Sequence, residues 1–121
     1  DGLPHSSINH IMQERAGALW FATGYARRGG AARLYRGSWS TLTKADGLAG
    51  ERVRSIFEDQ RGRLWFASEY DGVAIRDNNH WLLLTPQQGL AGWEVKYFLV
   101  DDHGVLWLGT ENGISRISAL P

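Results

Sequence analysis

The sequence predicts an all-β protein made of a unit that repeats almost three times, and two observations support this. An Asp-Gly-Leu motif at residues 1–3 recurs at 46–48 and, as Gln-Gly-Leu, at 88–90. A Gly turn followed by a Leu-Trp pair recurs in the same register, at intervals of 45 and then 42 residues. Short apolar runs and turn residues at such a period are typical of β-propeller blades, which cannot bury their faces alone.

The chain is expected to be a single propeller fragment, 1–121, with repeat units at approximately 1–45, 46–87 and 88–121. Apolar runs bounded by Gly, Asp and Asn predict four antiparallel strands in each of the first two units. These strands are expected at 8–13, 19–23, 32–36 and 39–43, and at 53–58, 64–68, 72–76 and 80–85. The third unit supplies strands at 95–100, 106–110 and 113–118, so this blade lacks its outer strand.

About three blades cannot close a ring, since closed propellers need at least about four. The sequence therefore predicts either a partial propeller from a longer chain or a ring completed by oligomerisation. Open blade edges carry unpaired backbone groups, so self-association is expected in both cases.

The first unit is longer than the second, and its three extra residues are expected between strands two and three. Tyr25, Arg27 and Arg28 would then lie in a long loop. The register of the third strand stays open at this stage, because Leu34-Tyr35 aligns either with Ala74-Ile75 or with the positions two further on.

Composition excludes several classes of function. The chain is 43% hydrophobic and 12% aromatic, which is globular, and its 13 basic and 13 acidic residues cancel. Without a net field, nucleic-acid binding is not expected. The absence of cysteine excludes disulfides and thiol nucleophiles. No signal peptide opens the sequence, and no run approaches the roughly 20 apolar residues of a membrane helix, so no membrane contact is expected of this segment.

The repeats resemble the two-component regulator propeller repeat, found in extracytoplasmic sensor regions of bacterial hybrid two-component systems. The resemblance rests on the 46–48 opening, Val53, Ile56, Glu58-Asp59, Gly62, the run 64–68 and Gly72. The third unit departs at Gln88, Phe98 and Leu108-Gly109, which keep the apolar or small character. The resemblance implies a periplasmic or extracellular location and an extracellular ligand, often a glycan. It also implies further blades, a transmembrane segment and kinase modules in the intact protein.

Five of the six tryptophans are expected in the core because they recur at equivalent blade positions. Trp20, Trp65 and Trp107 share one position, and Trp39 and Trp81 share another. Packing between blades requires the same residue type at the same position in each blade, whereas a single ligand site does not require such recurrence. Trp93 has no counterpart, so it is equally compatible with ligand contact and with packing at a blade edge.

Neither a cofactor, a metal site nor catalysis is predicted. His5, His10, His80 and His103 occupy unrelated positions without metal-ligand spacing. The segment 101–104, Asp-Asp-His-Gly, is read as a turn because it aligns with the turn at 59–62.

Topology indicates where a ligand would bind. In a four-stranded blade, the loops after strands two and four emerge on one face, and non-repeating residues there are the binding candidates. The candidates are Tyr25, Arg27 and Arg28 in the first unit, Glu69, Tyr70 and Asp71 in the second, and Glu111 and Asn112 in the third. The connecting loops add His5, Glu51, Arg52, Trp93 and Glu94. Aromatic, charged and amide side chains together suit a carbohydrate, although a solvated rim would have the same composition.

Two functions follow. The first is a non-catalytic, ligand-sensing propeller module that binds a carbohydrate or another small extracellular ligand. The alternative is a structural module for protein contacts that assembles edge to edge into a closed propeller. An enzyme is the least supported class, because no convergent acid, base or metal set is visible in the sequence.

Overall fold

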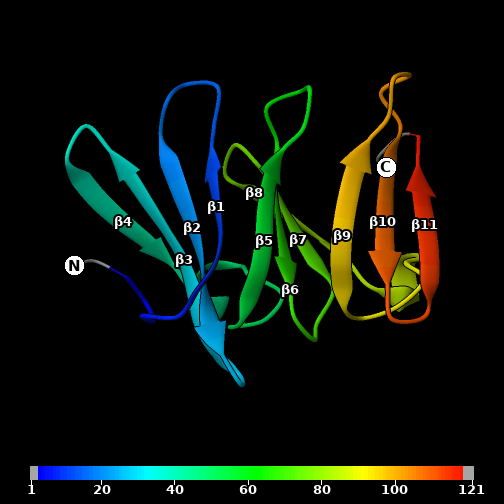
Figure 1. Cartoon of the computed structure of the whole chain (residues 1–121), viewed down its shortest axis with the longest axis horizontal. Helices are drawn as coiled ribbons and strands as arrows, with labels where there is room; N and C mark the ends of the chain where they lie inside the picture. Colours follow the sequence, from blue (N-terminus) through cyan, green and yellow to red (C-terminus); the bar gives the residue numbers. More distant parts are fainter. Residues whose placement is uncertain (1–2, 119–121) are drawn as a thin grey trace.

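The structure, a computed structural model, describes residues 3–118. These residues form three antiparallel sheets that stand side by side (Figure 1). The first contains β1 (Ile8–Gln13), β2 (Leu19–Tyr25), β3 (Arg28–Tyr35) and β4 (Ser38–Leu42). The second contains β5 (Val53–Glu58), β6 (Leu64–Ser68), β7 (Val73–Asp77) and β8 (His80–Leu84). The third contains β9 (Val95–Val100), β10 (Leu106–Thr110) and β11 (Gly113–Ile117). The predicted fold, β-propeller blades with an incomplete third blade, is confirmed.

The long loop predicted in the first unit is wrong. Strands β2 and β3 instead extend toward each other, and Tyr25 pairs with Arg28 across a turn of two residues. Ala26 adopts a φ of 55° there, a left-handed conformation suited to a tight hairpin. The extra residues of the first unit therefore lengthen a hairpin, and β3 begins at Arg28 instead of at residue 32.

The register left open in the first blade is also settled. Leu19 pairs with Leu34, as Leu64 pairs with Arg76 in the second blade. Leu34 is thus equivalent to Arg76, which is the alternative two positions further on. The middle strand β6 is buried from Trp65 to Ser68, as its continuous apolar run predicts for a strand covered on both faces.

Two apolar clusters join the blades, one at each interface. Trp20 of the first blade packs edge to face on Phe66 of the second, with ring centroids 5.2 Å apart. Trp65 occupies the equivalent place between the second and third blades, where Phe57 and Phe98 also stack. Burying an aromatic side chain contributes about 1.5–3 kcal/mol, so these layers dominate the cohesion of the stack.

The core prediction for the tryptophans is wrong for Trp39. Its indole is 41% exposed on the outer strand of the first blade, where it packs on Phe21 and where no preceding blade among residues 3–118 covers it. Trp81 and Trp107 are half-buried. Trp107 lacks a following blade among the described residues, which explains its difference from buried Trp65.

A hydrogen bond from the indole to a carboxylate recurs in every blade. The Nε1–H of Trp65 donates to Asp59 at 2.9 Å, that of Trp107 donates to Asp101 at 2.9 Å, and that of Trp20 donates to Glu14 at 2.7 Å. The other oxygen of Asp101 accepts the backbone N–H groups of His103 and Val105. The predicted turn role of residues 101–104 is therefore confirmed.

The connections between blades are short and capped. In the 3₁₀ helix Lys44–Asp46, the Asp46 carboxylate accepts the backbone N–H and the hydroxyl of Thr43. Gln88 does the same for Thr85 in the second connection, so the change from Asp to Gln keeps the cap. Gly47 is required because a Cβ there would lie 2.6 Å from the Trp81 indole. Residues 1 and 2 of the first motif lie outside the described residues.

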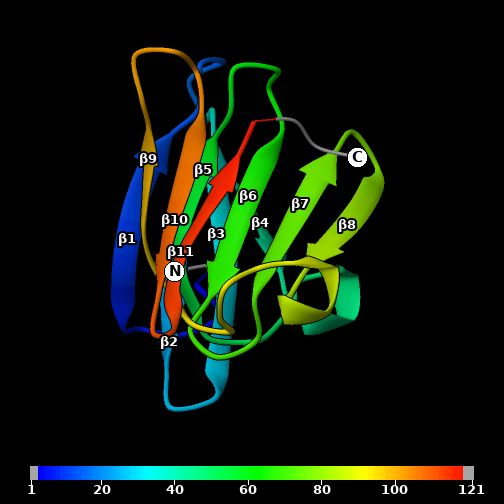
Figure 2. The same cartoon turned by 90° about the vertical axis from the view of Figure 1, so that its right-hand side faces the viewer.

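The first strands of the three blades share one side of the stack. Figure 2, viewed from the third blade, shows β1 and β9 at one side and β8 at the other. We call the side with β1, β5 and β9 the axial side. The turns after β2, β6 and β10 and the connections between blades lie at one end of the stack, which we call the hairpin face (Figure 1). Within residues 3–118, no helix is long and apolar enough to cross a membrane.

We predict that the indole-to-carboxylate bond makes stability depend on pH. Burial raises the pKa of Asp59, but the hydrogen bonds from Trp65, Arg63 and Arg61 outweigh it and hold this pKa below its ordinary value. The carboxylate therefore stabilises the fold above about pH 4, and this contribution is lost as the pH falls through the lowered pKa. In urea unfolding, Asp59→Asn should cost about 1–3 kcal/mol at pH 6. The difference in the free energy of unfolding between wild type and variant should be smaller at pH 3 than at pH 6. An equal difference at both pH values would contradict the prediction.

Candidate functional site

Four of the side chains singled out in the sequence meet on the hairpin face, between the first two blades. The guanidinium of Arg27 lies over the Tyr70 ring, 4.5 Å from its centroid. Arg52 donates from Nη1 to the Tyr70 hydroxyl at 3.1 Å, and its guanidinium lies 5.6 Å from the centroid of the Tyr25 ring. The hairpin of β2 and β3 thus bends onto the second blade, and alternating cations and rings form a continuous surface.

The remaining candidates on this face are distributed differently. Arg28 is exposed in the first hairpin, and Trp93 is 43% exposed in the connection before β9. Asp71 is half-buried and its backbone N–H donates to the Ser68 hydroxyl. Asn112 donates from its side chain to the carbonyl of Ala91. Within residues 3–118, no side-chain hydrogen bond joins these residues to the cluster of Tyr25, Arg27, Arg52 and Tyr70.

Glu111 braces the loop that carries Trp93. Its carboxylate accepts the backbone N–H of Glu94 at 2.9 Å and that of Trp93 at 3.4 Å. The Glu94 hydrogen bond is the main cause that lowers the pKa of Glu111. A Cβ on Gly92 would overlap this carboxylate, so a larger residue at that position would displace it. Glu111 therefore has a structural partner, and Trp93 is the exposed group that it positions.

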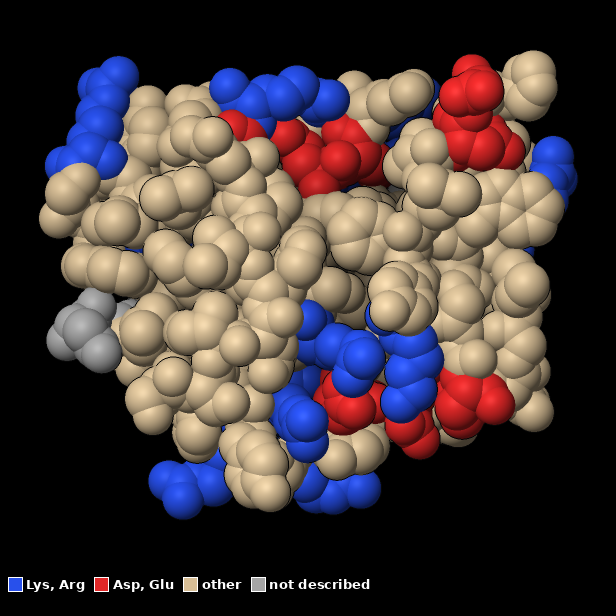
Figure 3. Space-filling view, in the orientation of Figure 1, with Lys and Arg blue, Asp and Glu red and all other residues tan. Residues whose placement is uncertain are grey.

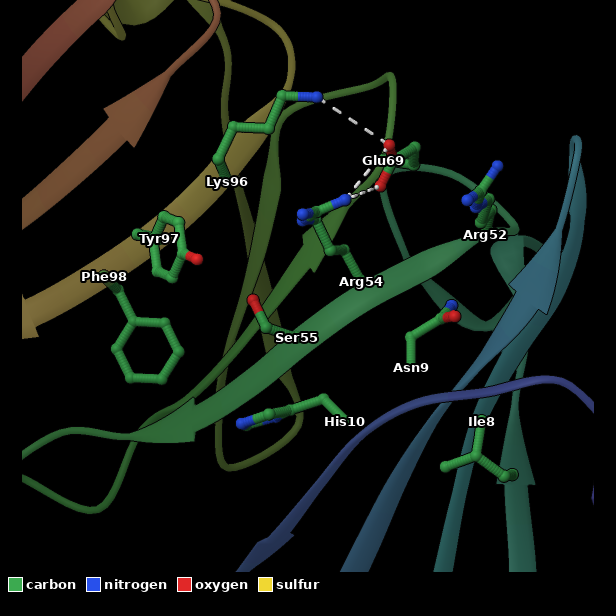
Figure 4. Close-up of a pocket in the computed structure, with 10 residues that line it drawn as sticks. All are labelled: Ile8, Asn9, His10, Arg52, Arg54, Ser55, Glu69, Lys96, Tyr97 and Phe98. Atoms are coloured by element: carbon green, nitrogen blue, oxygen red, sulfur yellow. Dashed lines mark hydrogen bonds and ion pairs between the residues drawn. The ribbon is translucent and has the colours of Figure 1, made fainter.

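Glu69 does not lie on the loop rim as the sequence predicts. Glu69 is only 7% exposed, and its side chain lies on the axial side, where it lines a groove. Arg54 donates to both of its oxygens at 2.9 and 3.3 Å, and the ammonium of Lys96 lies 3.8 Å away (Figure 4). Lys96 also pairs with Glu94 at 2.9 Å. Glu69 thereby links the second blade to the third.

The groove has a volume of about 600 Å³ and lies along the first strands of all three blades. Lysine and arginine atoms gather at the lower centre of this face, with acidic atoms beside them (Figure 3). The groove, called the axial groove below, is lined by Ile8, Asn9, His10, Arg52, Arg54, Ser55, Glu69, Lys96, Tyr97 and Phe98.

A β-bulge places three of these side chains. The pairing of the first strand with the second shifts by one residue at the same position in every blade, and the extra residues are Asn9, Arg54 and Lys96. A bulge bends the strand and redirects a side chain, which is why bulges occur often beside binding sites. The repeated backbone thus presents a different polar residue from each blade.

His10 and Ser55 add uncharged polar groups. Burial lowers the pKa of His10, and its Nδ1 accepts the backbone N–H of Ile56 at 3.2 Å. The neutral imidazole consequently carries its proton on Nε2. Ser55 is 7% exposed and its buried hydroxyl has no hydrogen-bond partner.

Sequence reasoning missed most of the axial groove, although a signal was available. Positions such as Ile8, Val53 and Val95 repeat as aliphatic residues, whereas the next two positions of the same strand do not repeat in kind. The criterion of non-repeating residues selects loop residues when it is restricted to loops, but it is equally informative in the first strands. Applied there, it would have selected Arg54 and Lys96.

No group of three or more His, Asp and Glu side chains is placed to hold a metal ion in the part of the chain that the structure describes.

The repeats match a known family. The sequence model described as the two component regulator propeller matches residues 2–25 and 47–70. These segments contain the Gly-Leu part of the opening, the first strand, the turn and the Leu-Trp strand. Residues 2–25 and 47–70 thus carry two-component regulator propeller repeats, in agreement with the predicted resemblance. The comparison with curated proteins gave no match.

Solved structures share the fold. The extracellular domain of the hybrid two component system BT3049 from B. thetaiotaomicron superposes with a TM-score of 0.79 at 19% identity, over 93% of this chain. The corresponding domain of BT4673 from the same organism gives 0.70 at 21% identity over 93%. PorZ, a surface component of the type-IX secretion system of Porphyromonas gingivalis, gives 0.70 at 17% identity over 93%. The chain spans only 16–17% of the length of these solved chains.

We predict that Glu69 is a structural anchor of the axial groove. Glu69→Gln should destabilise the fold by about 1–2 kcal/mol in urea unfolding, because Arg54 and Lys96 would lose their shared carboxylate. The cost stays below that of a fully buried pair, since the two cations are 37% and 35% exposed. The matched control is Glu94→Gln, whose more exposed carboxylate should matter by less than about 0.5 kcal/mol. Equal effects of the two substitutions would refute this role.

Proposed function

We propose that this chain is part of a non-catalytic, ligand-sensing propeller located on the outer side of the membrane. The observation that carries the proposal is the distribution of non-repeating polar and aromatic side chains. They gather on the hairpin face and in the adjoining axial groove, while the interfaces between blades are filled by repeated apolar residues. The repeat family and the extracellular domains with the same fold support the sensing role and the location.

A binding role fits the chemistry of the hairpin face. Tyr25 is 67% exposed and Trp93 is 43% exposed, so both rings can stack on the apolar face of a sugar. Arg27 supplies directional donors for hydroxyl groups. A glycan is accordingly the ligand class that this surface fits best.

The carboxylates support a non-catalytic role. Glu14, Asp59 and Asp101 each accept an indole N–H. Glu69 and Glu111 are held by side-chain cations and by backbone N–H groups. A general acid or base must reach the proton that it transfers, and these groups are already engaged in structural bonds.

The hairpin-face proposal predicts that Arg27→Ala, Tyr70→Ala and Trp93→Ala each weaken binding about tenfold, because exposed aromatic and Arg side chains dominate binding energy. The ligand would first be identified on a glycan array, and affinities would then be measured by calorimetry. Arg61→Ala, at the opposite end of the blade, is the control and should change nothing. Unchanged binding in all three variants would contradict the proposal, and so would hydrolysis or cleavage of any polysaccharide tested as a substrate.

Assembly into a ring is a second candidate, favoured by the two outer faces of the stack. Ile11 is 57% exposed, whereas the equivalent Ile56 is fully buried against the preceding blade. Leu99 is 62% exposed, whereas the equivalent Phe57 is 4% exposed against the following blade. The two faces are the halves of an interface that the chain already forms twice, so a second copy can pack on them head to tail.

For this candidate, light scattering should give a dimer or trimer whose fraction rises with protein concentration. Leu99→Glu should convert it to monomer, because a charge would be buried in an apolar interface. Lys44→Glu, an exposed change in a connection, serves as the control. A wild-type protein that stays monomeric at high concentration would exclude assembly by these faces.

A further inference from the structure

The axial groove holds more positive than negative charge. Arg52, Arg54 and Lys96 line it, and Glu69 is the only acidic residue among the lining residues described. Positive charge remains in excess when Glu94, the second partner of Lys96, is counted. Arg52 forms no ion pair among residues 3–118, and its Nε is buried without a hydrogen-bond partner.

The two cations that contact Glu69 keep free donors. Arg54 uses Nη1 for Glu69, and its Nη2 and Nε groups make no hydrogen bond to the described residues. The guanidinium is a planar fork that binds a carboxylate through two parallel hydrogen bonds. Glu69 therefore fixes the orientation of Arg54 and leaves one edge of the fork available.

An uncharged donor faces the same space. Figure 4 shows the Ser55 hydroxyl, the Arg54 guanidinium and the Tyr97 hydroxyl directed into the space between β5 and β9. Ser55 is more than nine-tenths buried, and its hydroxyl is unpaired. Buried polar groups are normally hydrogen-bonded, so an unpaired one that lines a groove points to a partner that comes from outside the chain.

We infer that the axial groove binds the carboxylate group of a small ligand, with Arg54, Ser55 and Lys96 as its donors. This inference rests on the proposed sensing function and names the chemistry of its ligand. Arg54 offers the fork, Lys96 contributes a point charge, and the Ser55 hydroxyl satisfies a remaining lone pair. Tyr97 and the Nε2–H of His10 are placed for hydroxyl groups, which makes a sugar acid the best fit among carboxylates.

The experiment is calorimetry of the 121-residue protein with three probes: glucuronate, glucose and acetate. Glucuronate should bind at least tenfold more tightly than glucose, because only glucuronate offers the carboxylate. Acetate tests whether the carboxylate suffices. Binding of acetate as tight as that of glucuronate would support the carboxylate site and assign it to simple organic acids instead of sugar acids.

Two variants locate the site. Ser55→Ala should weaken glucuronate binding about tenfold while leaving the melting temperature unchanged or higher, because the substitution removes an unpaired buried hydroxyl. Arg54→Lys keeps a cation beside Glu69 but loses the fork, and it should weaken binding several-fold. Ser38→Ala, an exposed change on β4, is the control and should have no effect.

Equal affinity for glucose and glucuronate would overturn the carboxylate inference and leave the sensing function standing. Glucuronate binding that Ser55→Ala does not change would overturn the location. The absence of binding by glucuronate and acetate would overturn the inference outright. The sensing function would then be judged separately by the glycan array and the hairpin-face variants.

Discussion

The stack depends on one repeated interaction, the bond between the central tryptophan of each blade and a carboxylate in the turn before it. Trp65 shows the principle: its ring fills the space between two blades, and its N–H would be an unpaired buried donor without Asp59. The same carboxylate also caps its turn through the backbone N–H groups of Arg61 and Arg63. One side chain therefore couples turn geometry to the packing between blades.

Because each first strand has a bulge at the same position, the blades keep one backbone geometry and carry different side chains there. Val53 and Ser55 keep their places in the sheet while Arg54 is left out of the pairing. Because the bulged residue makes no demand on the core, its identity can vary without loss of packing. Asn9 and Lys96 occupy the same place in the neighbouring blades. Variation of the side chains on the axial side thus costs the fold little.

Much of the fold could be predicted from the sequence because repetition fixes register. The strands that carry Leu-Trp pairs and their turns were placed correctly, since three copies constrain one another. The first hairpin was not, because the residues around Ala26 have no counterpart in the other units, and the hairpin contacts the second blade through Arg27 on Tyr70. The sequence predicts Trp39 in the core because recurrence indicates which blade position is covered in a complete ring. Recurrence does not indicate whether a given blade has a neighbour on that side.

The candidate site was predicted in part. Tyr25, Arg27 and Tyr70 meet as a face of non-repeating loops would suggest. The inward direction of Glu69 follows from ion pairs with Arg54 and, across a blade interface, with Lys96, which no local pattern reveals. The most direct test of the account is amide chemical-shift mapping during titration with glucuronate. If a carboxylate binds in the axial groove, the shifts should concentrate in β5 and β9 around Arg54, Ser55 and Lys96. Shifts confined to the turns opposite the hairpin face, or no shifts, would contradict it.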